Sequence, residues 1–81
     1  MDRTQARAEI ADEVTRILPD VHPAALPWHK HLRDLGADSI ERVEILLGVV
    51  RRFGLPTPLS EFAGLPDLNA VVDLVLDHAN A

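Results

Sequence analysis

Residues 38–54 read DSIERVEILLGVVRRFG, and this stretch predicts a helix whose start and end are both marked by the sequence. Asp38 can accept hydrogen bonds from the free amides of a first helical turn, and Glu41, three residues later, can bond back to the cap. The helix is therefore expected to begin at Ser39. Gly54 stands where a left-handed residue commonly ends a helix, and two prolines soon after it prevent continuation.

Apolar residues recur in this helix at steps of three and four, the spacing that places side chains on one face. The expected buried stripe consists of Ile40, Val43, Leu46, Leu47, Val50 and Phe53. The expected outer side chains are Glu41, Arg42, Glu44, Arg51 and Arg52. The helix is thus predicted to be amphipathic, with one face toward a core.

A first helix is predicted upstream, over residues 4–18. Asp2 or Thr4 is the candidate cap, and Pro19 ends the helix. Its expected core side chains are Ile10, Val14, Ile17 and Leu18, followed by Val21. Its expected solvated side chains are Arg3, Arg7, Glu9, Asp12, Glu13 and Arg16.

A long connection follows, because prolines at 19, 23 and 27 forbid a regular helix before Gly36. A connection of this length survives in a compact domain only when it is packed. We therefore expect it to lie over the bundle, held by Val21, Leu26, Trp28, Leu32 and Leu35.

The part after the quoted stretch predicts a short helix and a last, longer one. Residues 59–63 have room for about one helical turn before Gly64 and Pro66. Asp67 then caps a last helix whose core side chains are expected to be Leu68, Val71, Val72, Val75, Leu76 and Ala79. The predicted fold class is all-α, a small four-helix bundle of three main helices and a short third helix, with a long first loop, in one domain over residues 1–81.

Size and composition exclude several classes of function. A chain of 81 residues buries only about 60–65% of its unfolded surface, enough for one core but not for a deep catalytic cleft. The absence of cysteine excludes a disulfide framework and a thiolate metal site. A net charge of −5 disfavours nucleic acid and anionic membranes as partners. With no signal core or apolar span evident, we expect a cytoplasmic monomer.

The segment Asp34-Leu35-Gly36-Ala37-Asp38-Ser39-Ile40 resembles the phosphopantetheine attachment signature of acyl carrier proteins. The order of elements from about Ile10 to Ala79 is also similar to that family, so the resemblance covers nearly the whole chain. It implies that Ser39 carries a covalent 4′-phosphopantetheine arm, that its Oγ attacks the pyrophosphate of coenzyme A, and that Asp38 supports the incoming metal or transferase.

Physical reasoning independently favours a phosphate on Ser39, because free amides and the positive end of the macrodipole stabilise an anion at a helix N-terminus. No base or oxyanion partner is evident around this serine, so a hydrolase triad is not predicted. A carrier rather than an enzyme is expected. The histidines at 22, 29, 31 and 78 would form a metal site only if they converged, and none is predicted.

The resemblance also implies the partners: a phosphopantetheinyl transferase, and an acyltransferase, ketosynthase or hydroxymethylglutaryl-synthase-like enzyme. These enzymes are expected to bind the outer side of the second helix, where the candidate partner-binding residues are Ile40, Glu41, Arg42 and Glu44. An acyl chain is expected to lie against Leu46, Leu47, Val50 and Val72, unless these four are ordinary core.

Arg51 and Arg52 depart from fatty-acid synthase carriers, which usually have acids there. Residues 38–42 and 58–64 are more similar to free-standing carriers of bacterial polyketide pathways, and more narrowly to the donor carriers of β-branching cassettes. That similarity implies an acetyl thioester, made by decarboxylating a malonyl group, that is handed to a hydroxymethylglutaryl-synthase-like enzyme.

Two alternatives remain open at the level of sequence. A peptidyl carrier shares the serine and the fold, although such carriers are usually less acidic and belong to larger synthetases. An unmodified helical docking module would use Ser39 only to begin a helix, as many Asp-Ser pairs do. Attachment of phosphopantetheine distinguishes the docking module, and the loaded acyl or aminoacyl group distinguishes the peptidyl carrier.

Overall fold

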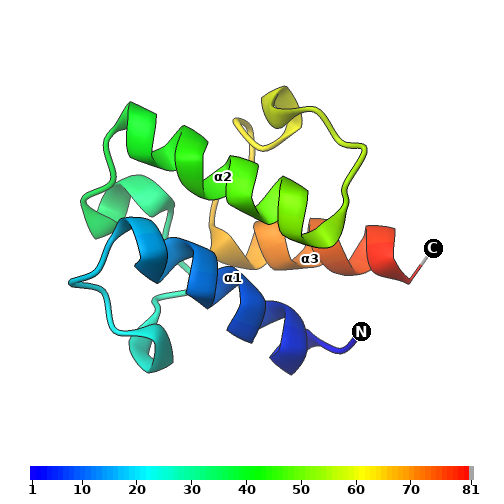
Figure 1. Cartoon of the computed structure of the whole chain (residues 1–81), viewed down its shortest axis with the longest axis horizontal. Coiled ribbons are helices and arrows are strands. Elements are labelled where there is room, and N and C mark those ends of the chain that lie inside the picture. Colours follow the sequence, from blue (N-terminus) through cyan, green and yellow to red (C-terminus); the bar gives the residue numbers. More distant parts are fainter. Residues whose placement is uncertain (81) are drawn as a thin grey trace.

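The computed structural model describes residues 1–80, and every regular element within them is helical. Three α-helices form the body: α1 (Arg3–Ile17), α2 (Ser39–Phe53) and α3 (Leu68–Ala79) (Figure 1). Three single 3-10 turns lie in the connections: η1 (Pro23–Ala25), η2 (Leu32–Leu35) and η3 (Leu59–Glu61). The all-helical class is confirmed. No described helix has the length and apolar character needed to cross a membrane.

The predicted short third helix is present only as the three-residue turn η3, so the described chain has three α-helices instead of four. Pro58 stands at the cap of η3 without a side-chain hydrogen bond, and the chain turns away again at Gly64. A segment this short closes i→i+3 bonds more readily than a full α-helical turn.

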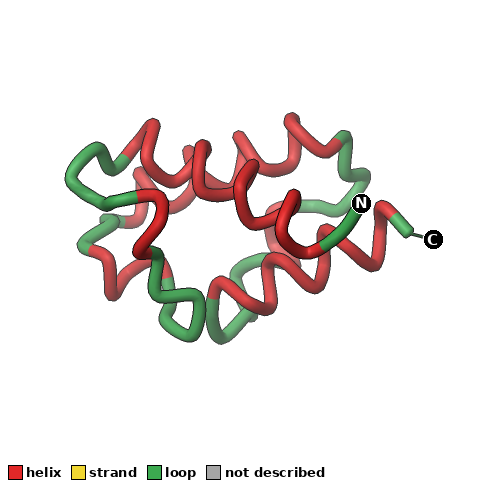
Figure 2. Tube along the Cα trace, turned by 90° about the horizontal axis from the view of Figure 1, so that it is seen from below, coloured by secondary structure: helices red, strands yellow, loops and turns green. Residues whose placement is uncertain are grey.

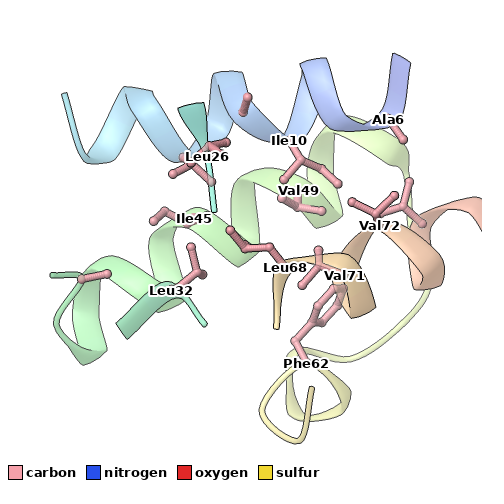
Figure 3. Close-up of a cluster of buried hydrophobic side chains, with 14 of the residues drawn as sticks. Ala6, Ile10, Leu26, Leu32, Ile45, Val49, Phe62, Leu68, Val71 and Val72 are labelled. Atoms are coloured by element: carbon pink, nitrogen blue, oxygen red, sulfur yellow. The ribbon is translucent and has the colours of Figure 1, made fainter. Parts of the chain in front are cut away.

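The core lies where the three helices meet (Figure 3). α1 packs against both α2 and α3, and α1 and α2 run in opposite directions (Figure 1). The largest fully buried side chains come from all three helices: Ile10, Val14, Ile45, Val49, Leu68, Val72 and Val75. Burying each of them contributes about 1.5–3 kcal/mol, which offsets the chain entropy that a disulfide-free domain loses on folding.

The buried face of α2 differs from the predicted stripe. Ile40 is 68% exposed and Val43 is 48% exposed, whereas Ile45, Gly48 and Val49 are buried. The remaining members of the predicted stripe, Leu46, Leu47, Val50 and Phe53, are half-buried. Apolar side chains cover more than one face of α2, so the sequence pattern alone does not decide which face packs against α1.

Gly48 allows a close approach between α1 and α2, and it explains a second difference. Glu13 was expected in solvent but is 7% exposed, with its carboxylate against the backbone of Gly48 and 3.4 Å from Arg16. Arg52 reinforces the same contact, donating to the carbonyl of Glu9 at 2.8 Å. A third difference is Ala79, expected in the core but exposed near the end of α3.

The long connection between α1 and α2 lies over one end of the bundle, as predicted, and residues 1 and 80 lie at the other end (Figure 2). Leu26 and Leu32 are buried beneath it. Two backbone bonds tie the connection to the start of α3: the amide of Asn69 donates to Trp28 at 2.8 Å, and that of Leu68 donates to Lys30 at 3.0 Å. The chain therefore enters α2 from an anchored segment.

Candidate functional site at the start of helix α2

Asp38 and Glu41 fix the first turn of α2 through a reciprocal capping box. The Asp38 carboxylate accepts from the Glu41 amide at 2.8 Å, and the Glu41 carboxylate accepts from the Asp38 amide at 3.0 Å. Ser39 is the first residue of the helix and is exposed. The predicted cap, capping box and helix start are all confirmed.

A second capping box holds the segment that leads to Ser39. In η2, Nδ1 of His31 accepts from the amide of Arg33, while the Asp34 carboxylate accepts from the amide of His31, both at 3.1 Å. Gly36 then turns the chain with φ of 91°, a left-handed conformation that favours glycine. The next residue, Ala37, is buried and anchors the chain just before Asp38 and Ser39. Ser39 is thereby presented on a locally braced turn.

The backbone at Ser39 has free hydrogen-bond donors. Among residues 1–80, the amides of Ser39 and Ile40 donate to no acceptor, and the Ser39 hydroxyl has no hydrogen-bond partner. Orphan amides at a helix N-terminus, with the positive end of the helix dipole, favour an anion. An exposed hydroxyl in this position fits a phosphodiester, because a bulky group can leave toward solvent while its oxygens stay near the amides.

A pocket of about 330 Å³ opens beside Ser39. Its walls come from η2, the outer part of α2, the η3 segment and the start of α3. The apolar side chains that line it are Leu32, Val43, Leu46, Leu59, Phe62, Ala63, Leu65, Leu68 and Val71. The polar ones are His31, Arg33, Ser39, Arg42 and Asp67. A mostly apolar pocket with a few polar groups at a hydroxyl is suited to a tethered organic chain.

The pocket is lined by other residues than most of those expected to contact an acyl chain. Of those four positions, only Leu46 lines the pocket. Val72 is fully buried in the core, while Leu47 and Val50 are half-buried elsewhere on α2. The burial of Val72 fits the alternative of ordinary core, and the sequence pattern did not indicate the η3 segment because no periodicity links a turn to a distant helix.

The predicted partner-binding residues fall into two groups. Ile40 and Glu44 are exposed, and the exposed Val43 joins them, although it was expected in the core. Glu41 is half-buried and engaged in the capping box, while Arg42 is half-buried, lines the pocket and donates to the Asp38 carbonyl at 3.3 Å. The outer face of α2 near Ser39 is therefore more apolar than predicted.

The histidines do not gather. His22 caps η1 and His31 caps η2, each through its Nδ1. Within residues 1–80, no group of three or more histidine, aspartate or glutamate side chains is arranged to hold a metal ion.

The comparisons with known proteins agree with this geometry. A family model described as the phosphopantetheine attachment site matches residues 8–75, which covers most of the chain, so the protein belongs to this family of carrier domains. Phosphopantetheine is the cofactor of the family, and its members are carriers instead of catalysts.

Two curated relatives are similar to this chain. The chain is 25% identical over 81 residues to the polyketide biosynthesis acyl-carrier-protein AcpK of Bacillus subtilis (strain 168), covering 100% of this chain and 99% of that protein. It is 27% identical over 79 residues to acyl carrier protein 2, mitochondrial, of Arabidopsis thaliana, covering 93% of this chain and 63% of that protein. No solved structure gives a significant match.

The protein is therefore an acyl carrier protein with a phosphopantetheine attachment domain. Acyl carrier proteins interact with phosphopantetheinyl transferases and with biosynthetic enzymes such as acyltransferases and ketosynthases. The resemblance carried by residues 34–40 is thus confirmed at the level of the family.

Proposed function

We propose that Ser39 carries the phosphopantetheine arm, and that the protein acts as one carrier domain delivering thioester-bound acyl groups to polyketide-type enzymes. The observation that carries this proposal is the exposed Ser39 hydroxyl at the N-terminus of α2, next to free amides and the mouth of a pocket. Ser60, the other serine of the chain, lies in the turn η3 and has no such helix start.

The loading step is a phosphoryl transfer to the Ser39 oxygen. Ser39 Oγ attacks the phosphorus of coenzyme A that bears the pantetheine, a P–O bond of the pyrophosphate breaks, and adenosine 3′,5′-bisphosphate leaves. The hydroxyl proton passes to a base of the transferase, because no base contacts Ser39 within residues 1–80. This chain supplies an accessible oxygen and amides that stabilise the product phosphodiester.

Asp38 has one role in the structure and a second that we assign by proposal. Its carboxylate caps α2, as the 2.8 Å bond from the Glu41 amide shows. We assign it also to the transfer step, as a charge that positions the metal or the transferase. An asparagine at position 38 separates the roles, since asparagine caps helices as well as aspartate but carries no charge.

Two surfaces then serve the loaded carrier. The pocket beside Ser39 receives the acyl end of the arm between reactions, which shields the thioester from water. The exposed side of α2, formed by Ile40, Val43 and Glu44, contacts the partner enzymes. Exposed apolar side chains next to a reactive group favour a contact that forms and releases repeatedly.

A narrower role in polyketide β-branching rests on two stretches of the chain. Residues 38–42 and 58–64 resemble the donor carriers of such cassettes, and both stretches contribute walls to the same pocket through Ser39, Arg42, Leu59 and Phe62. The name of the Bacillus subtilis relative places that protein in polyketide biosynthesis. We accordingly assign this carrier an acetyl group, formed by decarboxylating malonyl and passed to a hydroxymethylglutaryl-synthase-like enzyme.

Mass spectrometry tests the attachment site. Incubation with coenzyme A, magnesium and a broad-specificity transferase should add the mass of one phosphopantetheine to the wild-type chain and to Ser60→Ala, but not to Ser39→Ala. All three proteins should keep the same helical circular dichroism. An unchanged wild-type mass, under conditions that modify a control carrier, would support an unmodified docking module and refute the carrier proposal.

Two loading assays test the narrower role. The acetyl-loaded carrier should support turnover by a hydroxymethylglutaryl-synthase-like enzyme acting on a β-ketoacyl acceptor, whereas an acetyl-loaded fatty-acid synthase carrier should support less. Equal turnover with both carriers would remove the donor assignment. Loading of an amino acid by an adenylating enzyme, without acceptance of malonyl groups, would identify a peptidyl carrier.

A further inference from the structure

Two arginines of the Ser39 pocket have no carboxylate partner. Arg33 and Arg42 both line this pocket, and neither forms an ion pair within residues 1–80. Arg3, Arg16 and Arg52 each pair with an acid, whereas Arg7, Lys30 and Arg51 also form no ion pair among residues 1–80. Arg33 and Arg42 are distinguished by their place, because both line the pocket beside Ser39 in a chain with a net charge of −5.

Four acids around this pocket have partners of their own. The carboxylates of Asp34, Asp38 and Glu41 accept backbone amides in the two capping boxes. Asp67, which lines the pocket, caps α3 by accepting from the amide of Ala70 at 2.9 Å. These negative charges are therefore partly balanced by the positive ends of helices and turns, and the two guanidinium groups remain available to a ligand.

We propose that the pocket holds an acyl group that ends in a carboxylate, with Arg33 and Arg42 as the residues that determine this specificity. The inference rests on the proposed attachment at Ser39. A volume of about 330 Å³ accommodates a short acyl group, and the apolar wall formed by Leu46, Phe62 and Val71 receives its methylene carbon. Apolar walls also lower the local dielectric constant, which strengthens the attraction between guanidinium and carboxylate.

The phosphodiester of the arm presents the same anionic oxygen chemistry, but it has donors of its own. It is bonded to Ser39, where the free amides of Ser39 and Ile40 and the dipole of α2 already favour an anion. Arg33 lies in a different segment, the turn η2. The carboxylate of a bound acyl group is the anion that η2 and α2 can hold together.

The test compares two acyl groups of the same shape and different charge. A broad-specificity transferase loads the chain from coenzyme A, malonyl-coenzyme A or isovaleryl-coenzyme A. Isovaleryl has two methyl groups where malonyl has two carboxylate oxygens. The rate at which neutral hydroxylamine cleaves each thioester reports how well the pocket protects it, and mass spectrometry confirms that malonyl keeps its carboxylate throughout.

The variant Arg33→Met should raise the cleavage rate of the malonyl thioester about twofold to fivefold and leave that of the isovaleryl thioester essentially unchanged, as expected for an ion pair to an exposed guanidinium group. Arg42→Met should act in the same direction. The matched control is Arg51→Met, because Arg51 is exposed on α2 and lies outside the pocket. It should leave both rates unchanged.

Three results would overturn the inference in distinguishable ways. Equal effects of Arg33→Met on both thioesters would show that charge does not govern retention. The side-chain NMR signals of Arg33 and Arg42 can be compared in the unmodified chain, the chain with an unacylated arm and the malonyl-loaded chain. If the unacylated arm alone shifted these signals and malonyl added no further shift, the guanidinium groups would bind the phosphodiester. A chain that gains no mass from any of the three coenzyme A forms would refute the attachment site itself, and the pocket inference with it.

Discussion

The effect of substituting Gly48 by alanine should depend on Glu13, whose carboxylate occupies the space that the new methyl group needs. A Cβ added at Gly48 would lie 2.6 Å from Oε1 of Glu13, 2.9 Å from its Cδ and 3.0 Å from Nη2 of Arg16. The first two distances are far below van der Waals contact, so the Glu13 side chain must move. Arg16 is largely exposed and can move at little cost.

Two effects of opposite sign determine the magnitude. Alanine is preferred to glycine in a helix interior by about 0.5–1 kcal/mol. Forcing an extra methyl group into a packed contact costs about 1–3 kcal/mol, and the low end applies here because Oε1 and Cδ belong to the flexible end of the Glu13 side chain. The two effects therefore nearly cancel in the wild-type chain, and Gly48→Ala should change the free energy of unfolding by less than about 0.5 kcal/mol. In a Glu13→Ala chain the clash is absent, and the same change should raise it by about 0.5–1 kcal/mol.

Urea unfolding of four proteins, followed by helical circular dichroism, measures this difference. The set comprises the wild type, Gly48→Ala, Glu13→Ala and the double variant. The expected coupling energy between the two positions is about 1 kcal/mol, within the range seen for residues in contact. If Gly48→Ala changed the free energy of unfolding equally in both backgrounds, Glu13 would not lie against Gly48 and the packing described for α1 and α2 would be wrong.

Three further changes probe the site and the core. Asp38→Ala should lower the free energy of unfolding by about 1 kcal/mol, whereas Asp38→Asn should preserve it; full modification of the Asn variant by the transferase would show that the charge is dispensable. Leu68→Ala, at a position only 2% exposed, should cost about 2–5 kcal/mol in urea unfolding, and a loss below about 1 kcal/mol would contradict the core. Glu44→Lys should change the free energy of unfolding by less than about 0.5 kcal/mol but slow turnover by a cognate partner enzyme. The control Asp77→Lys, exposed on α3, should change neither the stability nor the turnover. Equal turnover by both variants would exclude that face of α2 as the contact surface.

Helix ends were predictable from the sequence because they depend on residues only a few positions apart. Asp2, Asp38 and Asp67 each cap the helix expected of them, and Gly54 ends α2 with φ of 61°. A cap needs one side chain and the amide three residues later, both present in the local sequence. Ser39 could be placed at a helix start for the same reason.

The contacts between elements were not predictable in this way. Ile40 and Val43 have the apolar character of core residues, but α1 covers the opposite side of α2. Gly48 has no side chain to contribute to a hydrophobic pattern, although the Glu13 side chain of α1 packs against it. A basic residue six positions before Ser39, Arg33, was the one sequence feature that could have indicated the pocket. Only the fold shows that Arg33 and Ser39 both line it.

The two capping boxes before and within the first turn of α2 have a consequence for cargo exchange. Each box closes over four residues, from His31 to Asp34 and from Asp38 to Glu41, and needs no contact from another helix. The turn η3 can therefore shift to admit or release an acyl group without displacing the Ser39 oxygen, while the start of α3 stays bonded to Trp28 and Lys30. The attachment point of the arm would then stay fixed while the opposite wall of the pocket moves.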